Sequence, residues 1–337
     1  IDLARAIAVV FMLYGHTVDA LLAPEHRHGV LHEVWQFQRG LTSCLFLLLS
    51  GFAFSVATVR HWQAQISFSP ALLRRARRFG LFILLGYVIH IPLAPLSRLL
   101  AADAAARQAL FTVDVLHVIG VTFIGVQLLV MATRSAGRFA AASVLLAAVL
   151  ILATPAVWDT AWQAHLPLPV AAYLSPATGS LFPVAPWSAF ILAGAALGQW
   201  YARRGVDALG AYANRVLLLP GAGLLVLGAW LTAQQRALFG NGLNTFVPGD
   251  MTTRAGVCFL LLGVVAHLSR RMSRLPHVFG AVAQESLVIY VVHLCLVYGS
   301  VWNPGLARYF SHRLAPGALV PLVLALIASM VLLAWYW

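Results

Sequence analysis

The chain contains no lysine and few charged side chains of any kind. Charged residues make up 9% of its 337 residues, whereas a soluble domain carries about 25%. Hydrophobic residues make up 61% of the chain, and its mean hydropathy is +0.86. This composition excludes an ordinary soluble domain and is typical of a polytopic membrane protein.

Cysteine is scarce as well, and the short motifs of several enzyme classes are missing. Cys44, Cys258 and Cys295 each fall inside an apolar run and lack metal-ligand spacing, so we expect packing residues and no metal. The sequence shows no Walker phosphate loop, zinc pattern or Gly-x-Ser-x-Gly nucleophile elbow. Because a serine nucleophile is missing, a histidine within the membrane becomes the leading reactive group.

All 22 basic side chains are arginines, and the formal net charge is +12. Most arginines lie between apolar runs, which favours a topology signal over a nucleic-acid partner. The side of the membrane that carries more of them, including Arg60, is expected to be cytoplasmic. We therefore predict that both ends of this chain are cytoplasmic, and that the membrane is a bacterial inner membrane.

Ten apolar runs are long enough to cross a bilayer. They predict an all-α membrane protein that forms one transmembrane domain over residues 1–337. The predicted spans are 2–22, 41–60, 78–97, 113–132, 138–156, 183–202, 214–233, 253–269, 280–300 and 316–337.

Ionisable residues interrupt the first predicted span. Arg5 and His16 are eleven residues apart, which is almost three helical turns, so both lie on one face. Asp2 lies one turn before Arg5, and Asp19 lies one turn after His16. Because ionisable residues inside a membrane are usually functional, we predict that His16 is a general base or acyl carrier. Asp19 would orient its imidazole. The alternative is that Asp2 and Arg5 are interfacial anchors and that His16 is a core residue.

Two later segments carry further polar candidates. Asp114 and His117 lie one turn apart near the start of the fourth span, where they could complete a polar site. The alternative is that Asp114 caps a helix. Tyr290 and His293 share a face of the ninth span, and Glu285 lies near its start. Hydrogen bonding between helices is the alternative for this group.

Three other positions stand out near predicted span ends. Arg74 and Arg75 form an arginine cluster with Arg77 and Arg78, which could contact the phosphates of a cytosolic nucleotide or coenzyme. Topology and anionic lipid binding are the alternative. Ser50 and Gly51 are small and predict a close helix approach or a bend. Trp187 follows a proline at the start of the sixth span, where both residue types are common.

The order of these segments resembles the multipass membrane acyltransferases, which comprise acyltransferase family 3 and the heparan-α-glucosaminide N-acetyltransferase-like proteins. The opening with Arg5 and His16 is similar to the arginine–histidine signature of family 3, although Ala6 replaces the usual glycine. Residues 16–19 look more like the glucosaminide acetyltransferase branch. Further segments similar to landmarks of these families are 46–52, 114–120, 182–188 and 286–293.

This resemblance implies acyl transfer across a membrane. A cytosolic acyl-CoA, usually acetyl-CoA, would donate its acyl group to a sugar hydroxyl or amine on the outer face. His16 would be the catalytic histidine, with Arg5 and Asp19 as its partners. The expected substrate- or coenzyme-binding residues are Asp2, Arg74, Arg75, Ser50, Asp114, His117, Trp187, Glu285, Tyr290 and His293. An acyl-histidine relay and direct transfer in a ternary complex both stay open.

A transporter or lipid flippase is the main alternative function, because the same polar residues could form a substrate or proton path. Against it, the sequence has no paired half-repeats and no glycine-broken spans at matching positions. A non-catalytic scaffold would not explain a histidine and carboxylates within spans. Binding or hydrolysis of acyl-CoA by the purified protein distinguishes these classes, since a transporter should show neither.

Overall fold

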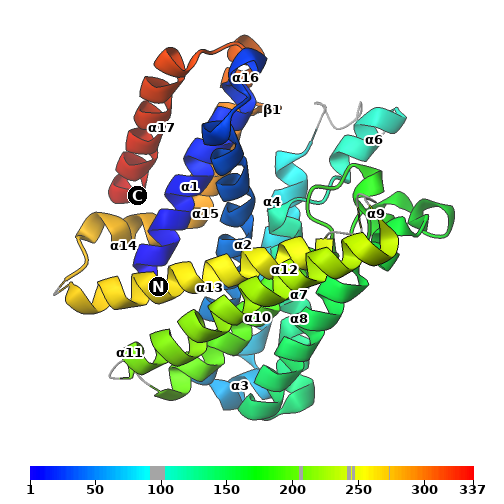
Figure 1. Cartoon of the computed structure of the whole chain (residues 1–337), viewed down its shortest axis with the longest axis vertical. Coiled ribbons are helices and arrows are strands. Elements are labelled where there is room, and N and C mark those ends of the chain that lie inside the picture. The colour runs from blue at the N-terminus through cyan, green and yellow to red at the C-terminus, as the bar shows by residue number, and fades with distance from the viewer. Residues whose placement is uncertain (92–102, 205–207, 241–243, 245–246, 273) are drawn as a thin grey trace. The chain divides into compact units, whose positions relative to one another are not determined.

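The computed structural model describes residues 1–91, 103–204, 208–240, 244, 247–272 and 274–337. Helices make up most of these residues (Figure 1). The two strands described form one short hairpin. The prediction of an all-α fold is therefore confirmed.

Seven helical segments are long and apolar enough to cross a membrane. A further pair, α14 and α15, bends by 72° and makes an eighth if it counts as one span. The seven are α1 (Asp2–Leu21), α2 (Val30–Val59), α7 (Val115–Thr133), α8 (Ala136–Asp159), Leu209–Phe239, α13 (Val247–Arg271) and α17 (Pro316–Tyr336). The chain is thus a multipass membrane protein, with fewer qualifying helices among its described residues than the ten spans predicted.

Two predicted spans correspond to helices outside that set. Helix α4 (Pro70–Ile89) begins eight residues earlier than the predicted third span, so its first half carries the arginine cluster. The Ser69 side chain caps it by accepting a hydrogen bond from the Leu72 N–H. The remainder of that predicted span, 92–97, lies outside the described residues. Helix α10 (Val184–Arg204) contains non-helical backbone at Ala185.

The segment Leu209–Phe239 is built from α11 (Leu209–Tyr212), η4 (Ala213–Leu218) and α12 (Leu219–Phe239). The shorter elements are η1 (Pro24–His26), α3 (Trp62–Ile66), α6 (Ala104–Leu110), η2 (Trp162–Ala164), α9 (Leu168–Ala171), η3 (Pro176–Thr178), α14 (His277–Gln284), α15 (Ser286–Val297), β1 (Gly299–Ser300), β2 (Asn303–Pro304) and α16 (Leu306–Phe310).

Contacts within the chain group into two compact units. Unit 1 includes Ile1–Phe46 and Arg271–Trp337, and unit 2 includes the described residues of Leu47–His90 and Ala102–Arg270. The boundary falls inside α2, and each unit is described by itself below. Whether the whole chain acts as one transmembrane domain stays a prediction.

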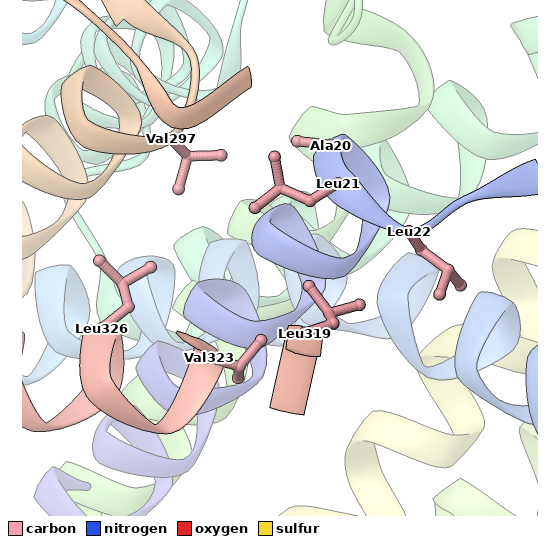
Figure 2. Close-up of a cluster of buried hydrophobic side chains, with 7 residues drawn as sticks. All are labelled: Ala20, Leu21, Leu22, Val297, Leu319, Val323 and Leu326. Atoms are coloured by element: carbon pink, nitrogen blue, oxygen red, sulfur yellow. The ribbon is translucent and has the colours of Figure 1, made fainter. Parts of the chain in front are cut away.

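In unit 1, α1 packs against α14, α15 and α17. Figure 2 shows the hydrophobic cluster at the end of α1, where Leu21 lies beside Val297 of α15 and Leu319 of α17. The chain before α17 returns to the same end of α1, because the backbone N–H of Leu314 donates to the carbonyl of Leu21 at 2.9 Å. These contacts fix the end of α1 that carries His16.

In unit 2, α2 and α10 approach so closely that only glycine fits between them. A Cβ on Gly51 would clash with the backbone carbonyl of Ile191, and one on Gly194 would clash with the carbonyl of Leu48. Gly194 and Gly198 form a Gly-x-x-x-Gly pair, a spacing that allows helix backbones to touch in membranes. The close approach predicted at Ser50 and Gly51 is therefore confirmed.

Candidate functional site

The predicted site residues fall into both units. Unit 1 contains Asp2, Arg5, His16, Asp19, Glu285, Tyr290 and His293. Unit 2 contains Ser50, Arg74, Arg75, Asp114, His117 and Trp187.

In unit 1 the structure brings together two histidines from opposite ends of the sequence. The rings of His16 on α1 and His293 on α15 have centroids 5.3 Å apart. His293 is fully buried, and its Nδ1 lies 2.9 Å from the carbonyl oxygen of Ile289. Because a carbonyl oxygen only accepts, Nδ1 carries the proton and Nε2 keeps its lone pair. That Nε2 is buried and has no hydrogen-bond partner among the described residues.

Tyr298, which the sequence analysis missed, completes this pair. Its hydroxyl lies 3.1 Å from Nδ1 of His16 and 3.4 Å from the His16 backbone carbonyl oxygen. Tyr298 follows the last residue of α15, so helical periodicity does not place it on the face of His293. The one feature of the sequence that could have pointed to Tyr298 is its position just after that helix.

The Asp19 carboxylate has a different partner from the one predicted. It accepts a hydrogen bond from Nη2 of Arg39 at 2.8 Å. The side chain hydrogen-bonded to the His16 ring is that of Tyr298. Arg27 also contacts this end of α1, because its Nη2 lies 2.5 Å from the Asp19 carbonyl oxygen. The proposed orienting role of Asp19 stays a prediction.

The other unit 1 candidates lie at the ends of their helices or beside His293. Arg5 is half-buried and Asp2 is exposed in the first turn of α1, and no ion pair joins them among the described residues. Glu285 occupies the bend between α14 and α15. The Tyr290 ring lies 5.7 Å from that of His293.

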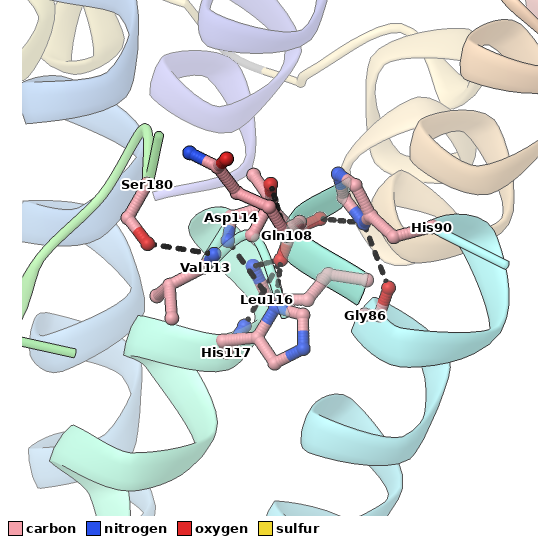
Figure 3. A network of polar contacts seen from close by, with 9 residues as sticks. Gly86, His90, Gln108, Val113, Asp114, Leu116, His117 and Ser180 are labelled. Atoms are coloured by element: carbon pink, nitrogen blue, oxygen red, sulfur yellow. Dashed lines mark hydrogen bonds and ion pairs between the residues drawn. The ribbon is translucent and has the colours of Figure 1, made fainter. Parts of the chain in front are cut away.

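In unit 2, Asp114 and His117 form a buried network at the start of α7 (Figure 3). The Asp114 Oδ1 accepts from the backbone N–H of Leu116 at 2.9 Å and of His117 at 3.1 Å. It also lies 2.8 Å from the His117 Nδ1. Asp114 is therefore a helix cap, which was the alternative considered for it, and a role in substrate binding stays a prediction.

Aromatic and glycine contacts enclose the His117 ring. A Cβ on Gly86 would lie 2.5 Å from the His117 Cε1, and the Tyr87 ring is 4.3 Å away. The hydroxyls of Tyr87 and Tyr173 are 3.3 Å apart. Burial, and then this hydrogen bond, raise the pKa of the Tyr173 hydroxyl, so it stays protonated. The His117 Nε2 is buried without a hydrogen-bond partner among the described residues.

Arg75 on α4 is held by neutral groups. Its Nη1 donates to the hydroxyl of Thr58 at 2.9 Å and to Oε1 of Gln127 at 3.1 Å, and its guanidinium lies 4.5 Å from the Phe54 ring centroid. Among the described residues, no carboxylate forms an ion pair with it. Its positive charge is therefore oriented but not neutralised, which suits an anion. Arg74 beside it is exposed.

Ser50 and Trp187 occupy less defined positions in unit 2. Ser50 is half-buried on α2, next to the close approach of Gly51 to α10. The Trp187 Nε1 is buried without a hydrogen-bond partner among the described residues, and its ring lies 4.8 Å from that of Phe182. A role for either in substrate binding stays a prediction.

Comparison with known protein families shows the family of the chain. A family model described as heparan-alpha-glucosaminide N-acetyltransferase, catalytic, covers residues 1–234. No curated protein matches the chain. The matched region includes His16, Arg75 and His117 but ends before His293 and Tyr298.

Proposed function

Because the chain belongs to the family of the heparan-alpha-glucosaminide N-acetyltransferase catalytic domain, we propose that it carries an acetyl group across the membrane. It is a multipass transmembrane acetyltransferase by family and by its apolar helices. The proposed donor is cytosolic acetyl-CoA, and the proposed acceptor is an amine of a sugar or glycan on the outer face. The proposed membrane is a bacterial inner membrane, and the arginine distribution favours an orientation with both ends of this chain cytoplasmic.

The contact between His16 and His293 is the observation that carries this proposal. Two neutral imidazoles whose ring centroids are 5.3 Å apart can accept and pass on a proton, which acyl transfer to an amine needs. Ionisable side chains are costly within a membrane, so a pair of them is best explained by a function.

Tyr298 fits a positioning role for this chemistry. When the Tyr298 hydroxyl donates its hydrogen bond to the His16 backbone carbonyl, its oxygen can accept a hydrogen bond from the N–H at Nδ1 of His16. The Nε2 atom of His16 then carries the lone pair that acts as the base. This is the tautomer logic by which a fixed partner orients a catalytic imidazole.

During the transfer, the acceptor nitrogen attacks the thioester carbonyl carbon of acetyl-CoA. A C–N bond forms as the C–S bond breaks, and His16 takes the proton that the amine loses. The departing thiolate recovers this proton from the histidine pair and leaves as free CoA, so the pair returns to its neutral state. The Nε2 atom of His293, which has no hydrogen-bond partner among the described residues, can take up the proton that His16 has accepted.

Arg75 and its neighbour Arg74 are the proposed contacts for the coenzyme phosphates. A guanidinium held by the neutral side chains of Thr58 and Gln127 keeps its charge for an anion, and arginine binds phosphate through two parallel hydrogen bonds. The other proposed substrate-binding residues are Asp2, Ser50, Asp114, His117, Trp187, Glu285 and Tyr290, with Arg5 and Asp19 supporting His16.

The test uses purified protein with radiolabelled acetyl-CoA and a panel of amino sugars. We expect label transfer and CoA release by the parent chain, and loss of at least about a hundredfold in the His16→Ala and His293→Ala variants. His61→Ala is the matched control, because His61 is exposed before α3 and outside the pair. All variants are compared by size-exclusion profile, so that misfolding is detected.

Three outcomes separate the alternatives. Turnover that survives in the His16→Ala variant would keep the acetyltransferase and remove the proposed role of His16. Turnover with O-linked product only would move the acceptor from amine to hydroxyl. Neither binding nor turnover of acetyl-CoA, together with solute movement in proteoliposomes, would favour the transporter.

A further inference from the structure

A short hairpin directly after α15 lines a cavity of about 360 Å³ that is largely open at the protein surface. Strands β1 and β2 pair antiparallel, with Val301 and Trp302 as the turn between them. Tyr298, Gly305 and Arg308 complete the lining. The volume lies at the small end of ligand pockets, which are about 300–1,000 Å³. The hairpin lies outside the region matched by the family model, so the family match assigns it no role.

Glycine and side-chain hydrogen bonds hold the hairpin in one shape. Gly299 has a φ of 89°, which L side chains rarely adopt, and a Cβ there would lie 2.7 Å from the Gly305 backbone nitrogen. The Ser300 hydroxyl donates to Oδ1 of Asn303 at 2.5 Å, and Asn303 Nδ2 donates to the Cys295 carbonyl at 2.7 Å. The cavity wall is thus ordered before any ligand binds.

The wall presents an aromatic face and a cation. Trp302 is 70% exposed at the tip of the hairpin, and Arg308 is exposed on α16. No hydrogen bond or ion pair of the Arg308 guanidinium is found within the described part of the chain. An indole ring offers a flat apolar surface on which the C–H face of a sugar can lie. A guanidinium binds carboxylate or sulfate groups through two parallel hydrogen bonds.

Tyr298 connects this cavity to the histidine pair. It lines the cavity, and its hydroxyl lies 3.1 Å from Nδ1 of His16. All of these residues belong to unit 1. A ligand in the cavity would therefore meet the same tyrosine that hydrogen-bonds to the proposed base.

We propose that this cavity binds the acceptor sugar, with the sugar ring on Trp302 and an anionic substituent of the glycan on Arg308. This assignment rests on the proposed function, because the cavity is an acceptor site only if acetyl transfer takes place at His16. An interfacial aromatic anchor is the competing role for an exposed tryptophan in a membrane protein, and it predicts no effect on a sugar.

The test measures acceptor binding and turnover separately, with the full chain in detergent micelles. Glucosamine oligosaccharides with and without a 6-sulfate are titrated without acetyl-CoA by calorimetry, and then used as acceptors in the acetyl-transfer assay. The variants are Trp302→Ala, Trp302→Phe and Arg308→Ala. Trp335→Ala is the matched control, since Trp335 is 66% exposed on α17 and does not line the cavity.

We expect Trp302→Ala to weaken acceptor binding and raise the acceptor KM about tenfold, the ratio equivalent to about 1.4 kcal/mol. The KM for acetyl-CoA and the behaviour of Trp335→Ala should not change. Trp302→Phe should recover most of the affinity, because the ring is kept. Arg308→Ala should weaken binding of the sulfated sugar alone, and added salt should reduce the difference.

The outcomes keep this proposal distinct from the proposed function. Sugar binding that is lost in Trp302→Ala, without acetyl transfer by the parent, supports the sugar site and contradicts the acetyltransferase mechanism. Acetyl transfer with an unchanged acceptor KM in Trp302→Ala overturns the sugar site and leaves the mechanism standing. Equal loss of stability in Trp302→Ala and Trp335→Ala, with unchanged sugar binding, identifies a membrane anchor and also overturns it.

Discussion

The hydroxyl of Tyr298 lies 3.1 Å from the Nδ1 atom of His16, although 282 residues separate them in the sequence. This contact joins the segment after α15 to the first helix of the chain. It also gives the imidazole of His16 a fixed partner on one ring nitrogen, so the other nitrogen is defined as the one available for a proton.

Replacing Tyr298 tests that arrangement. In Tyr298→Phe the ring is kept and the hydroxyl is lost, so His16 can rotate or change its tautomer. We expect kcat to fall about tenfold to a hundredfold while the KM for acetyl-CoA stays the same, and the pH profile of kcat to shift. A loss of stability alone would leave the pH profile in place. Tyr309→Phe serves as control, because Tyr309 is exposed on α16.

Removing the carboxylate of Asp114 should destabilise the fold. Asp114→Ala removes the cap of α7 and takes the carboxylate away from the buried His117. We expect the free energy of unfolding to fall by about 0.5–2 kcal/mol. Asp103→Ala is the control, since Asp103 caps α6 at an exposed site by accepting from the Ala106 N–H. Thermal unfolding in detergent measures the melting temperature of both variants. Equal decreases would contradict the prediction that the buried cap at Asp114 contributes more stability than the exposed cap at Asp103.

Because α2 and α10 approach closely, adding one methyl group at Gly51 should strongly lower the stability of the fold. Gly51→Ala would place Cβ against the Ile191 carbonyl, and the backbone cannot move away without separating the helices. We expect a destabilisation of about 1–3 kcal/mol. Gly80→Ala on α4 meets no atom within 4 Å and should be neutral or slightly stabilising. An unchanged melting temperature in Gly51→Ala would show that this packing is not present in the folded protein.

The proposed phosphate contact at Arg75 can be separated from a topology role. Arg75→Lys keeps the charge and loses the planar fork, so we expect the KM for acetyl-CoA to rise about tenfold with little change in the acceptor KM. Arg107→Lys, at an exposed position on α6, should change neither constant. If Arg75→Lys leaves the coenzyme KM unchanged, its side chain serves packing against Phe54 or membrane orientation.

The sequence predicted helices well where apolar runs were long, and poorly where charge interrupted them. The arginines before residue 78 looked like a loop, yet arginine has a high helix propensity, and Ser69 followed by Pro70 is a start signal for a helix. Helix α4 therefore begins earlier than predicted. A hydropathy pattern detects the apolar part of a helix and overlooks its charged first turns.

The sequence identified single residues of the site but not the contacts between them. His16 and His293 stood out because each interrupts an apolar helix, which is a local signal. Their contact depends on how α1 packs against α15, and no spacing in the sequence specifies that. Tyr298 and Arg39 lie at a helix end and in a neighbouring helix, where periodicity gives no information about which side chain reaches the site. Tertiary packing decided these partners.

The bend of 72° between α14 and α15 has a consequence for what surrounds His293. Helix α15 has 12 residues, which at about 1.5 Å per residue make a rod of about 18 Å, against a hydrocarbon core of about 30 Å. A helix that stops at such a depth exposes backbone N–H and C=O groups, and lipid cannot hydrogen-bond to them. If α14 and α15 form one span, the region around Glu285 needs protein or water to satisfy these groups. A proton leaving His293 would then need to travel only part of the membrane thickness to find solvent.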